Sequence, residues 1–570
     1  MEEVATSRTT SKRTAPTSRG SSAYARKRAV IACQVCRARR TKCDQKKPTC
    51  SFCESIGAEC VSDPPALSAF DPASVAIIER LDRLERRFTA FADVPARTHL
   101  FCQQPFASSY LQHLPYQNVD QILNWPALQE DRLSVSPNAS ARFASSPSCV
   151  PWGQTEGIDP AAGNILDTVA QSGLVDRFFL HVHSRNPILD EKKTRALAQL
   201  IHDRGMIGWD TESCLMLLVW ANGALGRPLP TPAQSERQYD QEQATALFLA
   251  AQQRLGPVLM TAGIMQAQCL FLAGVFLMSS LRPFDAWRMF LQALTMCRTF
   301  EKTMSCDATD TVAAESVYWS AWKSERELYR ELWSSADPRG SGLAHDHPRQ
   351  FPSLPADCEG ESLHTWYFYL SEISAWRLES HVEEEIARFA AEGGGRGGLE
   401  GLTEIANSLM QQAREWQNSL APKVSLQQQA DEYDGDMLRL ILRARVAYIQ
   451  DKISWPFIYA LLHDNMETES PKVRNWAAKG LSCHLHKLEI HRIQFYHRHH
   501  GTWVMIRSCA RSTAILLAAA RQPFSKTLLP SESDWRGAVE ATLEMLRFWQ
   551  PYVHGLREVV ERLEALYSEL

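Results

Sequence analysis

The chain has 570 residues, of which 45% are hydrophobic, and a formal net charge of -4 at pH 7. This length allows a sizeable core and favours several structural units over one ordinary domain. The charge is uneven, because residues 1–62 hold 13 Lys and Arg against 5 Asp and Glu. A basic head on an acidic remainder favours a polyanionic partner for the head, and nucleic acid is the first candidate.

The first segment of the chain, residues 1–29, predicts a disordered basic arm, because it lacks both helical periodicity and the apolar core of a secretory signal. Its run Arg26, Lys27 and Arg28 is typical of a nuclear import signal. The most apolar windows of the whole chain, 269–281 and 514–520, are shorter than the roughly 18 to 20 residues of a membrane span. We therefore expect a soluble protein with no membrane partner.

Six of the chain's 15 cysteines lie within 28 consecutive positions and form a repeat. Their spacing is C-x2-C-x6-C-x6-C-x2-C-x6-C, and a shift of 17 residues moves the first three onto the last three. The six positions are Cys33, Cys36, Cys43, Cys50, Cys53 and Cys60. Thiolates at such regular short spacing are typical of a structural zinc site.

Two tetrahedral zinc ions need eight thiolate positions, so six cysteines suffice only if two sulfurs each bind both metals. The repeat makes Cys33 and Cys50 equivalent, and they are the natural bridging pair. A single zinc ion with spare thiols fits the repeat less well. A disulfide knot is disfavoured, because the other nine cysteines are scattered and no export signal precedes them. The sequence predicts a domain at 30–61 that is held by two zinc ions, since so short a polar segment cannot fold by burial alone.

Basic residues follow the second cysteine and give the first half of the repeat its charge, whereas the second half carries acidic residues. If the segment CRARRTKC forms a short helix, its basic side chains fan out toward one groove of DNA. These candidate DNA-binding residues are Arg37, Arg39, Arg40 and Lys42. A solvated basic helix on a protein-binding zinc module is the alternative.

The six cysteines, with Pro48 between the halves and Asp44 after the third cysteine, resemble the DNA-binding domain of the fungal binuclear zinc-cluster transcription factors. The resemblance implies that the first helix enters the major groove and reads a CGG-type triplet. It places Arg39 and Arg40 on base edges and Arg37 and Lys42 nearer phosphate. It also implies a nuclear regulator of RNA polymerase II transcription and favours an activator.

A linker and a short heptad follow the cluster. Residues 62–73 are rich in Pro and Ala and predict a linker, and residues 74–93 predict a coiled-coil helix. The apolar seam of that helix is formed by Ile77, Leu81, Leu84 and Phe88. The resemblance implies that this coil makes a homodimer, whereas an ordinary amphipathic helix packed on the rest of the chain remains the alternative.

Residues 94–162 are rich in Pro, Ser, Gln and Asn and predict a largely disordered linker, and residues 163–570 carry helical periodicity throughout. Several stretches of this second part resemble the helical middle regulatory region of the same family, among them those starting at Leu174, Tyr318 and His497. No catalytic motif was found, so we expect no enzyme activity. The histidines of 483–500 are too far apart along a helix to predict a metal site.

The sequence thus predicts a small binuclear zinc-cluster domain, a short coiled coil and a large all-α regulatory domain. The leading function is sequence-specific binding of double-stranded DNA as a dimer, with contacts to the transcription machinery and a role in one pathway or gene cluster. The alternative is a zinc-scaffolded interaction module without sequence readout. A helical domain that senses a small-molecule effector is a third reading, although no sequence feature marks its site.

Overall fold

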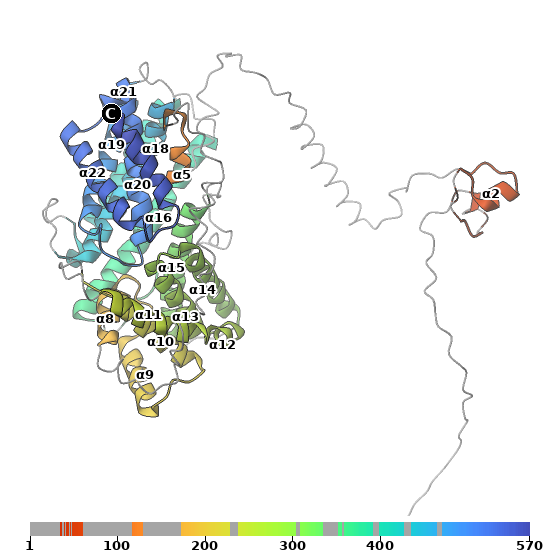
Figure 1. Ribbon diagram of the computed structural model, residues 1–570, viewed down its shortest axis with the longest axis horizontal. Coiled ribbons are helices and arrows are strands. Elements are labelled where there is room, and N and C mark those ends of the chain that lie inside the picture. The colour runs from red at the N-terminus through yellow and green to blue at the C-terminus, as the bar shows by residue number, and fades with distance from the viewer. Residues whose placement is uncertain are drawn as a thin grey trace, which may run out of the picture. The chain divides into compact units, whose positions relative to one another are not determined.

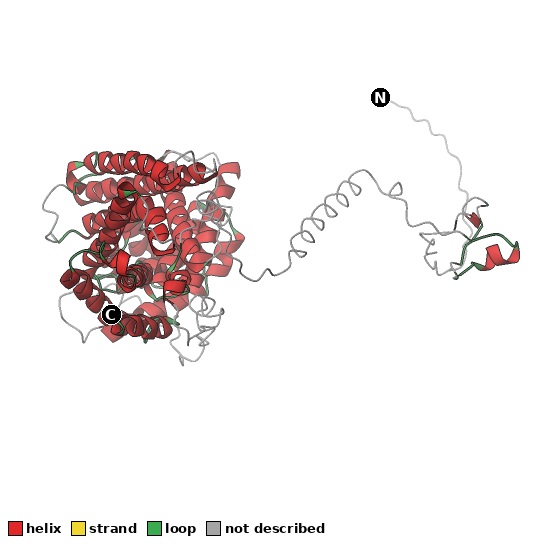
Figure 2. Cartoon of the chain, turned by 90° about the horizontal axis from the view of Figure 1, so that it is seen from above, coloured by secondary structure: helices red, strands yellow, loops and turns green. Residues whose placement is uncertain are grey.

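The computed structural model describes two groups of residues. They are 33, 35–36, 39, 41–44, 46 and 48–60 near the N-terminus, and 117–128, 173–228, 237–303, 308–333, 351–355, 358–391, 398–426, 435–463 and 470–570 farther on. The chain divides into two compact units, residues 1–103, here called the head, and residues 104–570, the body. Every regular element within the described ranges is a helix (Figure 2). The predicted arm 1–29, linker 62–73 and coiled coil 74–93 lie outside the described residues.

The head is built around its cysteines. Its regular helix, α2 (Ser51–Ser55), starts directly after Cys50 (Figure 1). Five of the six cysteines are its buried core, against which Val35 and Phe52 pack. A core of thiols with so few carbon side chains cannot supply the burial that folds a domain, so a bound metal must contribute the stability.

The first part of the body is a group of helices that gathers at one end of it (Figure 1). They are α8 (Leu174–His181), η3 (His183–Arg185), α9 (Glu191–Arg204), α10 (Thr211–Leu225), α11 (Arg237–Gln252), α12 (Leu255–Met260), α13 (Ile264–Ser279), α14 (Pro283–Thr303) and α15 (Ala308–Leu332). α10 and α13 are apolar on all sides and are buried on all sides, as helices of that composition must be. They therefore form the centre of this group.

The second part of the body begins with long helices and ends at the C-terminus. It contains α16 (Gly360–Ala391), α17 (Gly398–Asn418), η6 (Pro422–Val424), α18 (Met437–His463), α19 (Pro471–Arg492), α20 (Thr502–Arg521), α21 (Pro523–Lys526), α22 (Glu532–Trp549) and α23 (Leu556–Ser568). One continuous hydrophobic cluster joins residues of both parts. By length and composition α20 could cross a membrane, but 94% of its apolar window is buried inside the body. Helices in the core of a protein can be equally long and apolar. α20 is also longer than the apolar run 514–520 that the sequence suggested.

A short segment near the start of the body packs against the helices that follow it. Residues 117–128 form α5 (Val119–Leu123) and η2 (Pro126–Leu128). Val119, Ile122 and Trp125 are buried. The disorder expected for residues 94–162 therefore does not hold for 117–128, while the rest of that range lies outside the described residues.

Two features explain why 117–128 is helical and packs on the rest of the body: a capped helix start and a long-range ion pair. Asn118 and Gln121 form a complete capping box, in which each side chain accepts from the other's backbone N–H. Asp120 pairs with Arg507 of α20 at 2.9 Å, across 387 positions of sequence. The Asn118 side chain also donates to the backbone oxygen of Glu331 at 3.2 Å.

Charged side chains also join the helices inside the body. Asp451 of α18 is buried and lies 2.7 Å from Lys487 of α19 and 2.6 Å from Arg511 of α20. Arg507 is equally buried and pairs with Glu331 of α15 at 2.8 Å. A buried charge requires such a partner, because removing it from water is costly. These pairs therefore constrain how α15, α18, α19 and α20 pack.

Candidate metal centre and nucleic-acid interface

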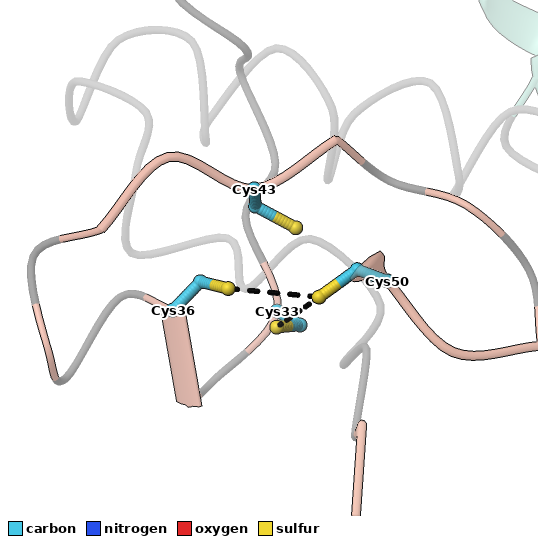
Figure 3. A group of neighbouring side chains, drawn as sticks. All are labelled: Cys33, Cys36, Cys43 and Cys50. Carbon is cyan, nitrogen blue, oxygen red and sulfur yellow. Dashed lines mark hydrogen bonds between the residues drawn. The ribbon is translucent and has the colours of Figure 1, made fainter. Parts of the chain in front are cut away.

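The six cysteines of the head come together as two groups of four. The sulfurs within each group lie within 4.8 Å of one another. One group is Cys33, Cys36, Cys43 and Cys50, and the other is Cys33, Cys50, Cys53 and Cys60. Figure 3 shows the first group, with the sulfur of Cys50 facing those of Cys33 and Cys36. Both groups contain Cys33 and Cys50, the pair that the sequence repeat marks as equivalent.

The sulfur spacing fits a metal rather than disulfides. Sγ of Cys50 lies 3.8 Å from Sγ of Cys33 and 3.6 Å from Sγ of Cys36, and Cys33 and Cys53 are 3.5 Å apart. A tetrahedral zinc ion with bonds of about 2.3 Å holds its sulfurs about 3.8 Å apart, whereas a disulfide needs about 2.0 Å. The donor set and its size therefore suit thiolate-bound zinc.

The twofold repeat of the sequence is also a repeat of backbone structure. Thr41 N–H donates to the carbonyl of Cys36 at 3.0 Å, and 17 positions later Ala58 N–H donates to the carbonyl of Cys53 at 3.0 Å. In the first half the N–H of Arg39 donates to the carbonyl of Val35, which makes one helical turn. The same backbone hydrogen bond thus follows the middle cysteine of each half.

The two shared cysteines differ electrostatically from their neighbours. The backbone N–H of Cys53 donates to Sγ of Cys50 at 3.5 Å and lowers the pKa of the Cys50 thiol. The N–H of Cys36 acts on Cys33 in the same way and lowers its pKa. Burial instead raises the pKa of Cys36 to about 12. Backbone donors therefore favour thiolate at the two sulfurs that belong to both groups.

Asp44 connects the two halves, a structural role that the sequence analysis missed. Its carboxylate accepts from the backbone N–H of Ser51 at 3.0 Å and from the Ser51 hydroxyl. These hydrogen bonds lower the pKa of Asp44. Asp44 thereby holds the loop after Cys43 against the start of α2. A carboxylate seven residues before a helix start is a weak signal, because capping residues usually lie next to the helix.

The candidate DNA-binding side chains are described only in part. Arg39 and Lys42 are exposed beside the first group of sulfurs. Arg37 and Arg40 lie outside the described residues, as do the predicted dimerisation residues Ile77, Leu81, Leu84 and Phe88. On the second half, Glu54 and Glu59 are exposed. The charge difference between the halves that the sequence predicts is therefore present on the surface.

Comparison with known protein families supports the assignment of the head as a zinc-binding domain. Residues 31–68 match the model of the fungal Zn(2)-Cys(6) binuclear cluster domain. A domain of this family binds two zinc ions, and the two overlapping groups of sulfurs provide the positions for them.

Three curated relatives are named as transcription factors, a class of regulators rather than enzymes. The putative transcription factor ecdB of Aspergillus rugulosus is 23% identical over 480 residues, which cover 78% of this chain and 81% of that protein. The Zn(2)-C6 fungal-type transcription factor afumD of Aspergillus fumigatus is 43% identical over 56 residues, or 10% of this chain and 15% of its own length. Oleate-activated transcription factor 1 of Saccharomyces cerevisiae is 40% identical over 73 residues, or 12% of this chain and 7% of that relative.

Proposed function

We propose that this chain, a fungal-type binuclear zinc-cluster transcription regulator, reads DNA sequence with the first half of its cluster and binds as a dimer. The observation that carries the proposal is the asymmetry of the head. Two equivalent halves share a metal core, yet one presents Arg39 and Lys42 and the other presents Glu54 and Glu59. Only the basic half suits a phosphate backbone.

We assign the metal ligands from the sulfur geometry. Cys33 and Cys50 bridge the two zinc ions, and the remaining cysteines complete the two tetrahedra, Cys36 and Cys43 on one metal and Cys53 and Cys60 on the other. The sulfur groups support this assignment, because they overlap at Cys33 and Cys50. Bound zinc supplies the folding free energy that the small core lacks, on the order of 10 kcal/mol per site.

We assign sequence readout to the arginines. Arg39 and Arg40 reach guanine in a CGG-type triplet, where the arginine fork pairs with O6 and N7, and Arg37 and Lys42 contact phosphate. The exposure of Arg39, one helical turn beyond Val35, supports this arrangement. Phosphate contacts position the head without specifying sequence, so specificity depends on the two base-reading arginines.

Dimerisation then sets the spacing of two triplets. The heptad seam at Ile77, Leu81, Leu84 and Phe88 joins two chains, and the second head binds at high effective concentration once the first is on DNA. The regulator acts in the nucleus on RNA polymerase II promoters, where the acidic body contacts the transcription machinery.

The experiment is selection from random double-stranded DNA by the full-length, zinc-loaded protein. We expect enrichment of paired CGG-like triplets at a fixed separation, lost in an Arg39→Ala, Arg40→Ala variant. A Leu81→Asp, Leu84→Asp variant separates the dimer claim, because it should enrich single triplets only. DNA binding without an enriched sequence, equal in wild type and the arginine variant, would instead favour the zinc-scaffolded interaction module.

A further inference from the structure

Residues 117–128 contact a surface of the body that is built from α18, α20 and α23 and is here called the docking surface. Its residues are Trp455, Tyr459, His463, Arg507, Arg511 and Arg562. α5 packs against α20 in the second part of the body (Figure 1). The carbonyl of Gln117 accepts from Arg511 at 2.8 Å, and the carbonyl of Leu128 accepts from Arg562 at 3.1 Å. Arginines of the body therefore hold both ends of the segment.

Trp125 is the aromatic anchor of the segment and is only 4% exposed. Its ring centroid lies 6.0 Å from that of Trp455, 5.9 Å from that of Tyr459 and 4.7 Å from that of His463. These three residues follow one another at steps of four along α18, and the rings of Tyr459 and His463 are stacked at 3.9 Å. The aromatic wall is thus built by contacts within α18, so it is preformed for the tryptophan.

The charged groups of the docking surface also have partners within the rest of the body. Arg507, which receives Asp120, also pairs with Glu331 of α15 at 2.8 Å. Arg511, which donates to the first residue of the segment, also pairs with Asp451 of α18 at 2.6 Å. Departure of the segment therefore leaves neither buried arginine without a carboxylate, a state that would strongly destabilise the body.

The segment makes local hydrogen bonds that shape it before it meets the body. The capping box of Asn118 and Gln121 fixes the start of α5. The indole N–H of Trp125 donates to the side-chain oxygen of Gln117 at 2.7 Å, within the same segment. Local bonds of this kind reduce the ordering cost of binding, because less of the peptide has to be fixed at the surface.

A short helix that lays its apolar side chains on an aromatic wall, with a charge pair beside them, is a recurring mode of peptide recognition. We propose that 117–128 is a reversibly docked peptide ligand of the body, and that the docking surface binds the same peptide when another molecule supplies it. Docking leaves residues 61–116 between the cluster and the first held residue, whereas release leaves 61–172. The docking surface thus sets the length of chain between head and body, independently of the contacts of the head with DNA.

The test measures binding of a fluorescein-labelled peptide with the sequence of 117–128 to the full-length, zinc-loaded protein, by fluorescence anisotropy. In the wild type the chain's own segment competes at high effective concentration, so the peptide should bind weakly. An Asp120→Ala, Trp125→Ala variant frees the docking surface and should bind the peptide at least about 10-fold more tightly. A peptide of the same composition in scrambled order should bind neither protein.

Three results would overturn the proposal. One is equal affinity of the peptide for the wild type and the variant, and another is no binding to the variant at submillimolar protein concentration. The third is loss of the helical fold of the body in the variant, measured by circular dichroism. That result would show that 117–128 is a structural part of the core and not a ligand of it.

Two further changes, each added to the Asp120→Ala, Trp125→Ala variant, locate the site. Tyr459→Ala removes a half-buried ring that contacts the tryptophan of the segment, and it should weaken peptide binding about 10-fold. Tyr552→Ala removes an exposed tyrosine outside the docking surface and should leave the affinity unchanged. Equal affinity with and without Tyr459→Ala would refute the assignment of the docking surface.

Discussion

Because Cys50 belongs to both groups of sulfurs, its replacement should damage both zinc sites, whereas replacement of Cys43 should damage one. A structural zinc site of four thiolates contributes about 10–16 kcal/mol, so each thiolate contributes about 3 kcal/mol, or more than 100-fold in affinity. Cys43→Ala should therefore lose this amount at one site, and Cys50→Ala should lose it at both. In a zinc buffer that just saturates the wild type, the weakened sites should be empty.

The assay is zinc content per chain by atomic emission after dialysis into that buffer. We expect two zinc ions in the wild type, about one in Cys43→Ala and close to none in Cys50→Ala. Cys53→Ala should behave like Cys43→Ala, and Cys358→Ala, which lies in the body, should keep both ions. If Cys50→Ala retained one zinc ion as firmly as Cys43→Ala does, the shared-thiolate arrangement would be wrong.

Three further predictions concern the body. Asp451→Asn leaves Lys487 buried without its counter-charge, so the free energy of unfolding in urea should fall by about 3–5 kcal/mol, and a loss below about 1 kcal/mol would contradict that pairing. Asp120→Ala removes the carboxylate that pairs with Arg507, and hydrogen exchange in 117–128 should accelerate about 30-fold, equivalent to about 2 kcal/mol; an unchanged exchange rate would show that burial alone holds the segment. Burial acts to raise the pKa of Glu383, but the attraction of the surrounding cations is larger and holds this pKa at about 2, below the ordinary 4.5. The ionised Glu383 carboxylate should therefore stabilise the fold above pH 4.5, and this stabilisation should be lost as the pH falls toward 2. A free energy of unfolding that stays constant over this pH range in the wild type but not in Glu383→Gln would contradict the prediction.

The metal centre could be predicted from the sequence because its ligands lie close together along the chain. All six cysteines lie within 28 positions, and the four-coordinate geometry of zinc limits how their sulfurs can be shared between two ions. The shift of 17 residues that relates the halves in sequence also relates the hydrogen bonds of Thr41 and Ala58 in the structure. The all-helical body followed from hydrophobic periodicity for the same reason, since periodicity is a property of neighbouring residues.

The features that sequence reasoning missed depend on distant residues. Segment 117–128 looked polar and unpatterned, and its partner Arg507 is 387 positions away. Asn118 and Gln121, spaced as a capping box before a short apolar run, were the available signal.

The measurement that tests the account most directly is the affinity of the full-length, zinc-loaded protein for its selected DNA site and for a shuffled site, by fluorescence anisotropy. The account predicts that Arg39→Ala lowers the ratio of the two affinities by about 1–3 kcal/mol, or roughly 5- to 160-fold. Lys46→Ala, which removes an exposed cation outside the predicted contacts, should leave the ratio unchanged. Equal ratios in wild type and Arg39→Ala would contradict sequence readout by the first half of the cluster.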